Sequence, residues 1–197
     1  MFAETFLRED RMFRKLIAFC LLTIFLVTHA IAASVRELQL DEIVTTATVA
    51  FEGTCTGNRT ERDPATSMVV TYTTFSVKDV LKGNVQATHV IKQIGGGMPD
   101  GETAFRVVGI PSFAVGEDYV VFLAGVSSAG FSSPIGLSQG KFTVRQGANG
   151  KTVTNGRNTR ELTTRMPNAG VPLSAEPTVH FDLEEFKQLA RDHANRP

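Results

Sequence analysis

The run DYVVFLAG, residues 118–125, decides the fold class of this chain. It is almost continuously apolar and rich in β-branched and aromatic residues, as is typical of a central, buried strand. Further runs with strand character lie on both sides of it, at residues 48–56, 68–81, 88–94, 103–109, 141–146 and 151–155. Strands and helices do not alternate along the chain, which argues against a doubly wound sheet. We therefore expect a mainly β protein, either a small antiparallel barrel or a sandwich, with a C-terminal helix.

The flanking runs differ in how clearly they indicate strands. In TVAFEGTCT, residues 48–56, Phe51 and Cys55 share one apolar face, so we predict that Cys55 is a small buried hydrophobic residue. Residues 57–67 are polar and contain a proline, which predicts a loop. The sequence GANG, residues 147–150, lies between two strand-like runs and ends in Asn-Gly, which predicts a hairpin turn.

Two helical segments are expected outside the strands. LDEIVTTA, residues 40–47, predicts a short helical turn before the first strand. Near the C-terminus, Asp182 followed three positions later by Glu185 has the form of a capping box. An apolar stripe at helical spacing follows, formed by Leu183, Phe186, Leu189 and Ala190. We expect a terminal helix within residues 179–197 that packs on the β domain, after a polar linker at residues 157–178.

The N-terminal segment has the three parts of a secretory signal peptide: basic residues, an unbroken apolar run and small residues at its end. We predict cleavage between Ala32 and Ala33, which makes residues 1–32 the signal peptide and residues 33–156 the β domain. Met12 is an alternative start, because acidic residues precede it, which is unusual for a signal peptide. An uncleaved anchor is the other interpretation, but the apolar run is short for crossing about 30 Å of hydrocarbon.

The predicted mature chain has 165 residues, a net charge of −1 and one cysteine, Cys55. Its length suits one domain with its own hydrophobic core. There is no excess of basic residues, so we expect no nucleic-acid partner and no stable membrane insertion after cleavage. A single cysteine allows no intramolecular disulfide. The expected location is the periplasm or the extracellular space.

The glycine run in QIGGGMPDGE, residues 93–102, raises the question of a phosphate-binding loop. Such a loop needs a helix directly after the glycines, and the nucleoside-triphosphate version also needs Lys-Ser or Lys-Thr. Here PDG follows, which is typical of a turn. We therefore predict that Gly95, Gly96 and Gly97 end a strand and begin a mobile loop. With Phe113, which is either exposed or fills the end of the barrel, they form a candidate binding rim.

A second motif, GLSQG at residues 136–140, matches the G-x-S-x-G nucleophile elbow of α/β-hydrolases and makes Ser138 a candidate nucleophile. That elbow requires a helix directly after the serine, whereas residues 141–146 have strand character. The acid and the histidine would have to come from the terminal helix, from an aspartate with His193. A small serine hydrolase that uses Ser138 is therefore the alternative and not the main prediction.

Metal and cofactor sites are not indicated by the sequence. Zinc needs several convergent ligands, and His89, His180, His193 and Cys55 are far apart along the chain. We therefore predict no metal ion, no cofactor and no catalytic residue.

Four blocks in a fixed order resemble those of a group of small exported bacterial proteins with no assigned activity. They are TFSVKDVLKGN (74–84), GGG (95–97), GIPSFAVGEDYVVFL (109–123) and GLSQGKFTV (136–144). The resemblance covers about residues 38–146 and implies no catalytic residue. The sequence VLKG between two strands is also similar to netrin-type domains and tissue inhibitors of metalloproteases, which implies an OB-like barrel. Those inhibitors use a disulfide-held N-terminal cysteine that this chain lacks, so their mechanism does not carry over.

Together these features predict an exported, non-enzymatic binding or interaction module. Its partner is expected to be a protein or another envelope component, of unknown identity. A structural envelope protein is a further alternative beside the hydrolase.

Overall fold

The computed structural model describes residues 36–98, 104–147, 149–157, 162–163, 166 and 180–195. The chain divides into two compact units, residues 1–35 and 36–197, and all the described residues belong to the second. The predicted signal peptide and its cleavage site between Ala32 and Ala33 lie outside the described residues. Among the residues that are described, no helix is long and apolar enough to cross a membrane.

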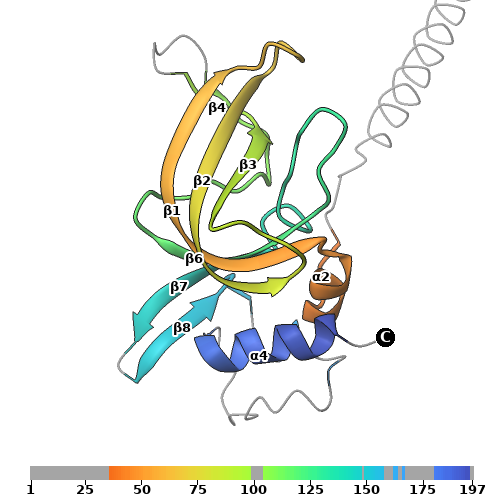
Figure 1. The fold of residues 1–197 in the computed structure, drawn as a ribbon, viewed down its shortest axis with the longest axis vertical. Helices are drawn as coiled ribbons and strands as arrows, with labels where there is room; N and C mark the ends of the chain where they lie inside the picture. The colour runs from red at the N-terminus through yellow and green to blue at the C-terminus, as the bar shows by residue number, and fades with distance from the viewer. Residues whose placement is uncertain are drawn as a thin grey trace, which may run out of the picture. The chain divides into compact units, whose positions relative to one another are not determined.

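The second unit is mainly β, with helix α2 (Leu40–Thr46) before the strands and helix α4 (Leu183–Ala194) after them (Figure 1). The strands are β1 (Val49–Arg62), β2 (Val69–Lys82), β3 (Thr88–Ile94), β4 (Gly96–Gly97), β5 (Ala104–Phe105), β6 (Asp118–Leu123), β7 (Lys141–Gly147), β8 (Gly150–Thr154) and β9 (Phe181–Asp182). Seven of them form one antiparallel sheet in the order β3-β2-β1-β6-β7-β8-β9, and β4 pairs with β5. The predicted mainly β, antiparallel fold with a C-terminal helix is confirmed, and the hydrogen-bonded sheet stays open between β3 and β9.

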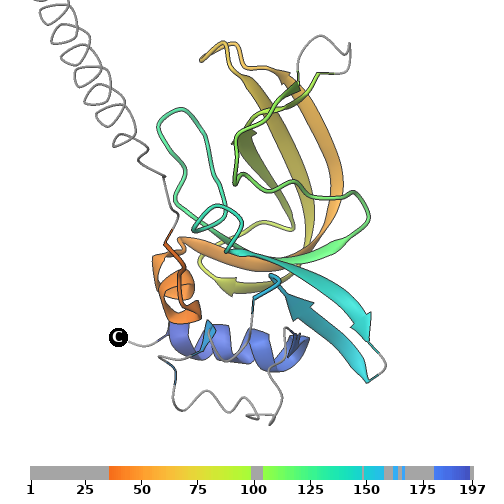
Figure 2. The ribbon, with the colours of Figure 1, turned by 180° about the vertical axis from the view of Figure 1, so that it is seen from behind.

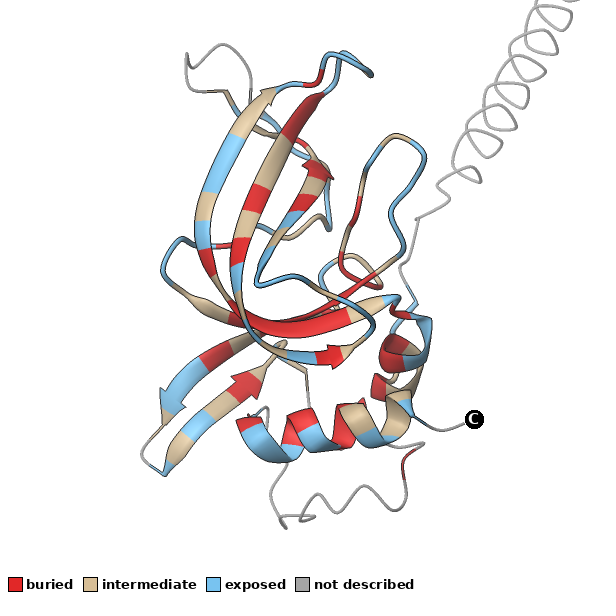
Figure 3. Cartoon of the chain, in the orientation of Figure 1, coloured by how far each residue is buried: buried red, intermediate tan, exposed pale blue. Residues whose placement is uncertain are grey.

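Strand β6 is buried on both faces, as its apolar sequence predicts. Tyr119, Val121 and Leu123 face one hydrophobic core, and Val120 and Phe122 face another. The first, which we call the inner core, consists of Phe51, Cys55, Phe75, Ile91, Phe113, Tyr119, Val121 and Leu123. The second, the helix-side core, joins α2 and α4 to the opposite face of the sheet, as the view from behind in Figure 2 also shows. The buried residues also run without a break along the first part of β1 (red in Figure 3).

Three of the predicted assignments are wrong. Gly96 and Gly97 are predicted to begin a mobile loop, but they form β4 and pair with β5. Residues 57–62 were expected in a loop, but β1 continues through them to Arg62 and pairs with β2. This part of the strand extends beyond the inner core and carries polar side chains. Its sequence therefore lacks the alternation of apolar and polar residues that would predict a strand. The strand expected at residues 103–109 is reduced to β5, because the chain turns at Val107, whose carbonyl accepts the Ile110 N–H at 3.2 Å.

Helix α4 begins and packs as its sequence predicts. The Asp182 carboxylate accepts hydrogen bonds from the backbone N–H groups of Glu184 and Glu185, at 2.9 and 3.1 Å. The whole predicted stripe is buried in the helix-side core: Leu183, Phe186, Leu189 and Ala190. Leu162 and Met166, which lie within the predicted linker, are buried in the same core. This segment therefore contributes side chains to the fold and does more than connect its parts.

A buried ion-pair network joins α4 to the sheet. The Lys187 ammonium lies 2.9 Å from the Glu52 carboxylate, 3.0 Å from Asp79 and 2.7 Å from Glu184. The side chains of Lys187 and Glu52 are only 7% and 6% exposed. Burial alone would lower the pKa of Lys187, but hydrogen bonds to Glu184, Glu52 and Asp79 raise it above its usual value. The lysine therefore stays charged, which the buried Glu52 carboxylate requires.

We expect Lys187→Met to lower the free energy of unfolding by about 3 kcal/mol or more, because it leaves the Glu52 carboxylate buried without its cation. The matched control is Lys151→Met, which removes a half-exposed lysine 3.5 Å from Asp118 and should cost at most about 1 kcal/mol. Urea denaturation at pH 7 measures both changes. Equal losses in the two variants would contradict the role given to the buried pair.

The same network predicts an acid dependence of stability. Burial would raise the pKa of Asp79, but hydrogen bonds from Arg191 and Lys187 outweigh it and hold the pKa below its usual value. An aspartate of this kind stabilises the fold above its unfolded-state pKa of about 3.9, and the stabilisation is lost as the pH falls through the lower folded-state value. Asp79→Asn should therefore reduce stability at pH 7 and have little effect near pH 2. An equal cost at both values, measured by urea denaturation, would contradict this assignment.

Candidate functional site

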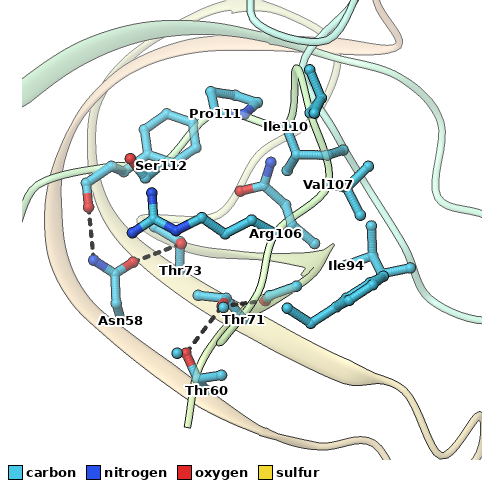
Figure 4. Close-up of a pocket in the computed structure, with 17 residues that line it drawn as sticks. Asn58, Thr60, Thr71, Thr73, Ile94, Arg106, Val107, Ile110, Pro111 and Ser112 are labelled. Atoms are coloured by element: carbon cyan, nitrogen blue, oxygen red, sulfur yellow. Dashed lines mark hydrogen bonds between the residues drawn. The ribbon is translucent and has the colours of Figure 1, made fainter. Parts of the chain in front are cut away.

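A pocket of about 500 Å³ opens beside the first three strands of the sheet (Figure 4). Its lining comes from β1 and β2, from residues 93–97 at the end of β3 and in β4, and from residues 105–108 and 110–113. The volume falls within the range of small-molecule sites in proteins. The pocket is therefore the candidate functional site of the described part of the chain.

The wall formed by β1 and β2 is polar and fixed by its own hydrogen bonds. The Asn58 amide donates to the Phe113 carbonyl at 2.7 Å, and its oxygen accepts from the Thr73 hydroxyl at 2.7 Å. The hydroxyls of Thr60 and Thr71 lie 3.0 Å apart, and Thr71 donates to the Gly95 carbonyl at 2.7 Å. These hydrogen bonds connect β1 and β2 to the backbone at Gly95 and Phe113. The wall is therefore held in place without a ligand.

Two further groups on the lining have hydrogen-bonding capacity that the fold does not use. Gln93 is 3% exposed, and its amide Nε2 has no hydrogen-bond partner among the described residues. Arg106 is the only charged residue among the described residues that line the pocket. Its side chain reaches into the pocket toward the side where Asn58 and Thr73 lie (Figure 4). The pocket therefore presents a guanidinium as a donor for a bound molecule, and its lining also contains a buried amide whose N–H group is unpaired among the described residues.

The opposite side of the pocket is apolar. It is lined by Ile94, Phe105, Val107, Val108, Ile110 and Pro111. Phe105 and Val108 are 45% and 95% exposed, so the apolar lining continues onto the protein surface beside the pocket. An apolar wall facing a few placed polar groups is the usual composition of a small-molecule site.

The structure brings the four residues of the predicted binding rim together. Gly95, Gly96, Gly97 and Phe113 all line the pocket, although they come from separate segments. Phe113 is 4% exposed and packs edge to face on Phe75 and Tyr119, with ring centroids 5.0 and 5.1 Å apart. Phe113 is therefore not exposed but buried in the inner core of an open sheet. The turn expected from PDG at residues 99–101 lies outside the described residues.

Sequence reasoning missed the polar wall and both free donors. Thr71 and Thr73 stand at every second position of VTYTT, residues 70–74, and this period does place them on one face of a strand. Gln93 and Arg106 fall in runs with strand character, where polar residues are normally solvent-facing. No local pattern distinguishes a polar residue in a pocket from one on the surface.

The surroundings of Ser138 differ from those of a nucleophile elbow. GLSQG forms a turn between β6 and β7, and the segment after it is a strand, so no helix N-terminus faces the serine. Gly136 and Leu137 have left-handed backbone, at φ 61° and 65°, and Ser138 does not. The strained, helix-opening serine that the motif requires is therefore missing from this turn.

The other candidate ligands are also dispersed. Cys55 is buried in the inner core, and burial raises the pKa of its thiol. His89 packs edge to face on Phe51, with ring centroids 5.3 Å apart, and burial lowers its pKa. Within the described ranges, no group of three or more His, Cys, Asp or Glu residues could hold a metal ion.

We expect Gly96→Ala to lower the free energy of unfolding by about 1–3 kcal/mol. Gly96 has φ +139°, and an added Cβ would overlap the Thr71 hydroxyl and lie 2.7 Å from a methyl group of Thr60. Gly97→Ala is the matched control, because its Cβ would meet no atom within 4 Å. Thermal unfolding compares the two, and equal stability would contradict the close packing assigned to Gly96.

No protein-family model matches the chain, and no curated protein matches it. The resemblance to small exported bacterial proteins therefore stays a prediction from the sequence.

Proposed function

We propose that the chain is an exported, non-enzymatic binding module that holds a small ligand, or a short part of a larger partner, in the pocket beside β1, β2 and β3. The observation that carries this proposal is the pocket itself. A self-supported polar wall faces an apolar wall, and Gln93 and Arg106 supply donors between them.

The walls of this pocket favour binding over catalysis. Catalysis by nucleophile and base needs a reactive side chain within hydrogen-bond reach of a second group that takes its proton. The described lining has Thr, Ser, Asn, Gln and Arg as its polar residues, and no His, Cys, Asp or Glu. Threonines 60, 71 and 73 are hydrogen-bonded to the fold itself.

Export to the periplasm or the extracellular space is part of the proposal and is supported by the sequence of residues 1–32. Expression of the full chain in a bacterial host, followed by mass analysis of the product outside the cytoplasm, tests it. The expected product begins at Ala33. A product that keeps the apolar segment would contradict cleavage and favour an anchor.

Binding is tested by native mass spectrometry of the purified protein after incubation with small molecules extracted from a bacterial envelope. We expect a bound species that disappears in Ser112→Trp, because the added indole covers the pocket wall. Ser138→Trp is the matched control, since it adds the same side chain at an exposed serine outside the pocket.

Two outcomes would overturn the proposal. One is a bound species that persists in Ser112→Trp or is lost only in Ser138→Trp, because the ligand would then lie elsewhere. The other is hydrolysis of a generic ester that Ser138→Ala abolishes, which would establish the hydrolase alternative.

A further inference from the structure

We propose that the pocket selects a small amphipathic carboxylate, with the carboxylate at Arg106 and Gln93 and the apolar part along Ile94, Val107 and Ile110. This inference rests on the proposed binding function and specifies the chemical class of the ligand.

The charge of the ligand follows from the lining. Arg106 is the one charged group among the described lining residues, and no ion pair of the described residues involves its guanidinium. A second cation contacts two lining residues from outside the lining: the Lys141 ammonium donates to the Ser112 carbonyl at 2.6 Å and lies 5.1 Å from the centroid of the Phe113 ring. Both cations favour an anion in the pocket. Guanidinium binds a planar carboxylate through two parallel hydrogen bonds, which adds orientation to attraction.

Gln93 supplies the second, independent observation. A buried amide N–H without a partner destabilises the fold, and a native structure rarely keeps one without a reason. This one belongs to a lining residue that is 3% exposed, and its Nε2 atom is itself buried, so an acceptor in the pocket would satisfy it after a rotation of the Gln93 side chain. The two oxygens of one carboxylate can accept hydrogen bonds from both the Arg106 guanidinium and the Gln93 amide.

The apolar part of the ligand follows from the facing wall. Ile94, Val107 and Ile110 are half-buried on the lining, and Phe105 and Val108 are exposed at its rim. A hydrocarbon chain that covers them removes apolar surface from water, which is favourable in proportion to the area covered. A pocket of about 500 Å³ accommodates a short chain together with its head group.

The probe for this inference is octanoate, compared with octanamide, which has the same chain and no charge. Isothermal titration calorimetry of the purified protein is expected to show octanoate binding at least about 10-fold more tightly than octanamide, because hydrogen bonds to a charged group are roughly twice as strong as neutral ones. A short apolar peptide with a free C-terminal carboxylate, compared with its amide, then distinguishes a free acid from a peptide terminus as the source of the group.

Two variants locate the carboxylate. Arg106→Gln should weaken octanoate about 10-fold and leave octanamide unchanged, whereas Arg145→Gln, an exposed arginine of β7 outside the pocket, should change neither. Gln93→Leu should weaken octanoate while the ligand-free protein keeps or gains stability, because an unpartnered buried donor is removed. A purely structural glutamine would show the opposite: lower stability and unchanged affinity.

The outcomes separate this inference from the proposed function. If octanamide binds as tightly as octanoate and Ser112→Trp blocks both, the pocket is a binding site and the carboxylate assignment is wrong. If Arg145→Gln weakens octanoate as much as Arg106→Gln does, the selectivity comes from net charge and the assignment to Arg106 is wrong. If the envelope ligand persists in Ser112→Trp, the proposed binding site itself is overturned.

Discussion

The fold depends on the burial of both faces of the sheet where β1 pairs with β6. Along this pair, Phe51 and Val121 face the inner core, and Ala50 and Phe122 face the helix-side core. The pairing with β6 ends at Thr54, and β2 is the only strand of the described residues that pairs with the rest of β1. Beyond Cys55, none of the described residues of β1 belongs to either core. The polar extension of β1 and β2 is what leaves room for a pocket, so the arrangement of the cores determines where the candidate site lies.

The helix-side core also sets a condition on charge. Glu52 lies between core residues of β1 at 5% exposure, where an unpaired carboxylate would be strongly unfavourable. Its partner, Lys187, comes from α4, more than a hundred residues further along the chain. A leucine or methionine pair in this place could pack as well in several helix positions, whereas the ion pair is satisfied in only one. We therefore infer that the network specifies the position of α4 on the sheet more than it adds net stability.

The sequence predicts those parts of the structure in which apolar periodicity and burial coincide. The strands at residues 68–81, 88–94 and 118–125 and the stripe from Leu183 to Ala190 follow this rule. The extension of β1 does not, because its side chains face the pocket and solvent. The glycines of the rim could be found because backbone conformation restricts residue type. Arg106 and Gln93 could not be found from the sequence. Their roles depend on whether residues distant in the sequence supply them with hydrogen-bond partners, and no local pattern shows this.

For the proposed ligand, selectivity would come from the difference between polar groups that the fold already hydrogen-bonds and those that it leaves unpaired. Asn58, Thr71 and Thr73 are hydrogen-bonded within the protein. A ligand would gain little affinity by replacing these hydrogen bonds, so this wall would act mainly as a rigid surface. In the proposed complex Arg106 and Gln93 would gain new partners, and the Gln93 amide is already desolvated without a ligand. The fold has already removed water from the Gln93 amide. A hydrogen bond from this amide to a ligand acceptor therefore contributes more to the binding free energy than a hydrogen bond from a solvated donor. A ligand that lacks such an acceptor leaves the buried donor unpaired, and this discriminates against purely apolar molecules of the same size.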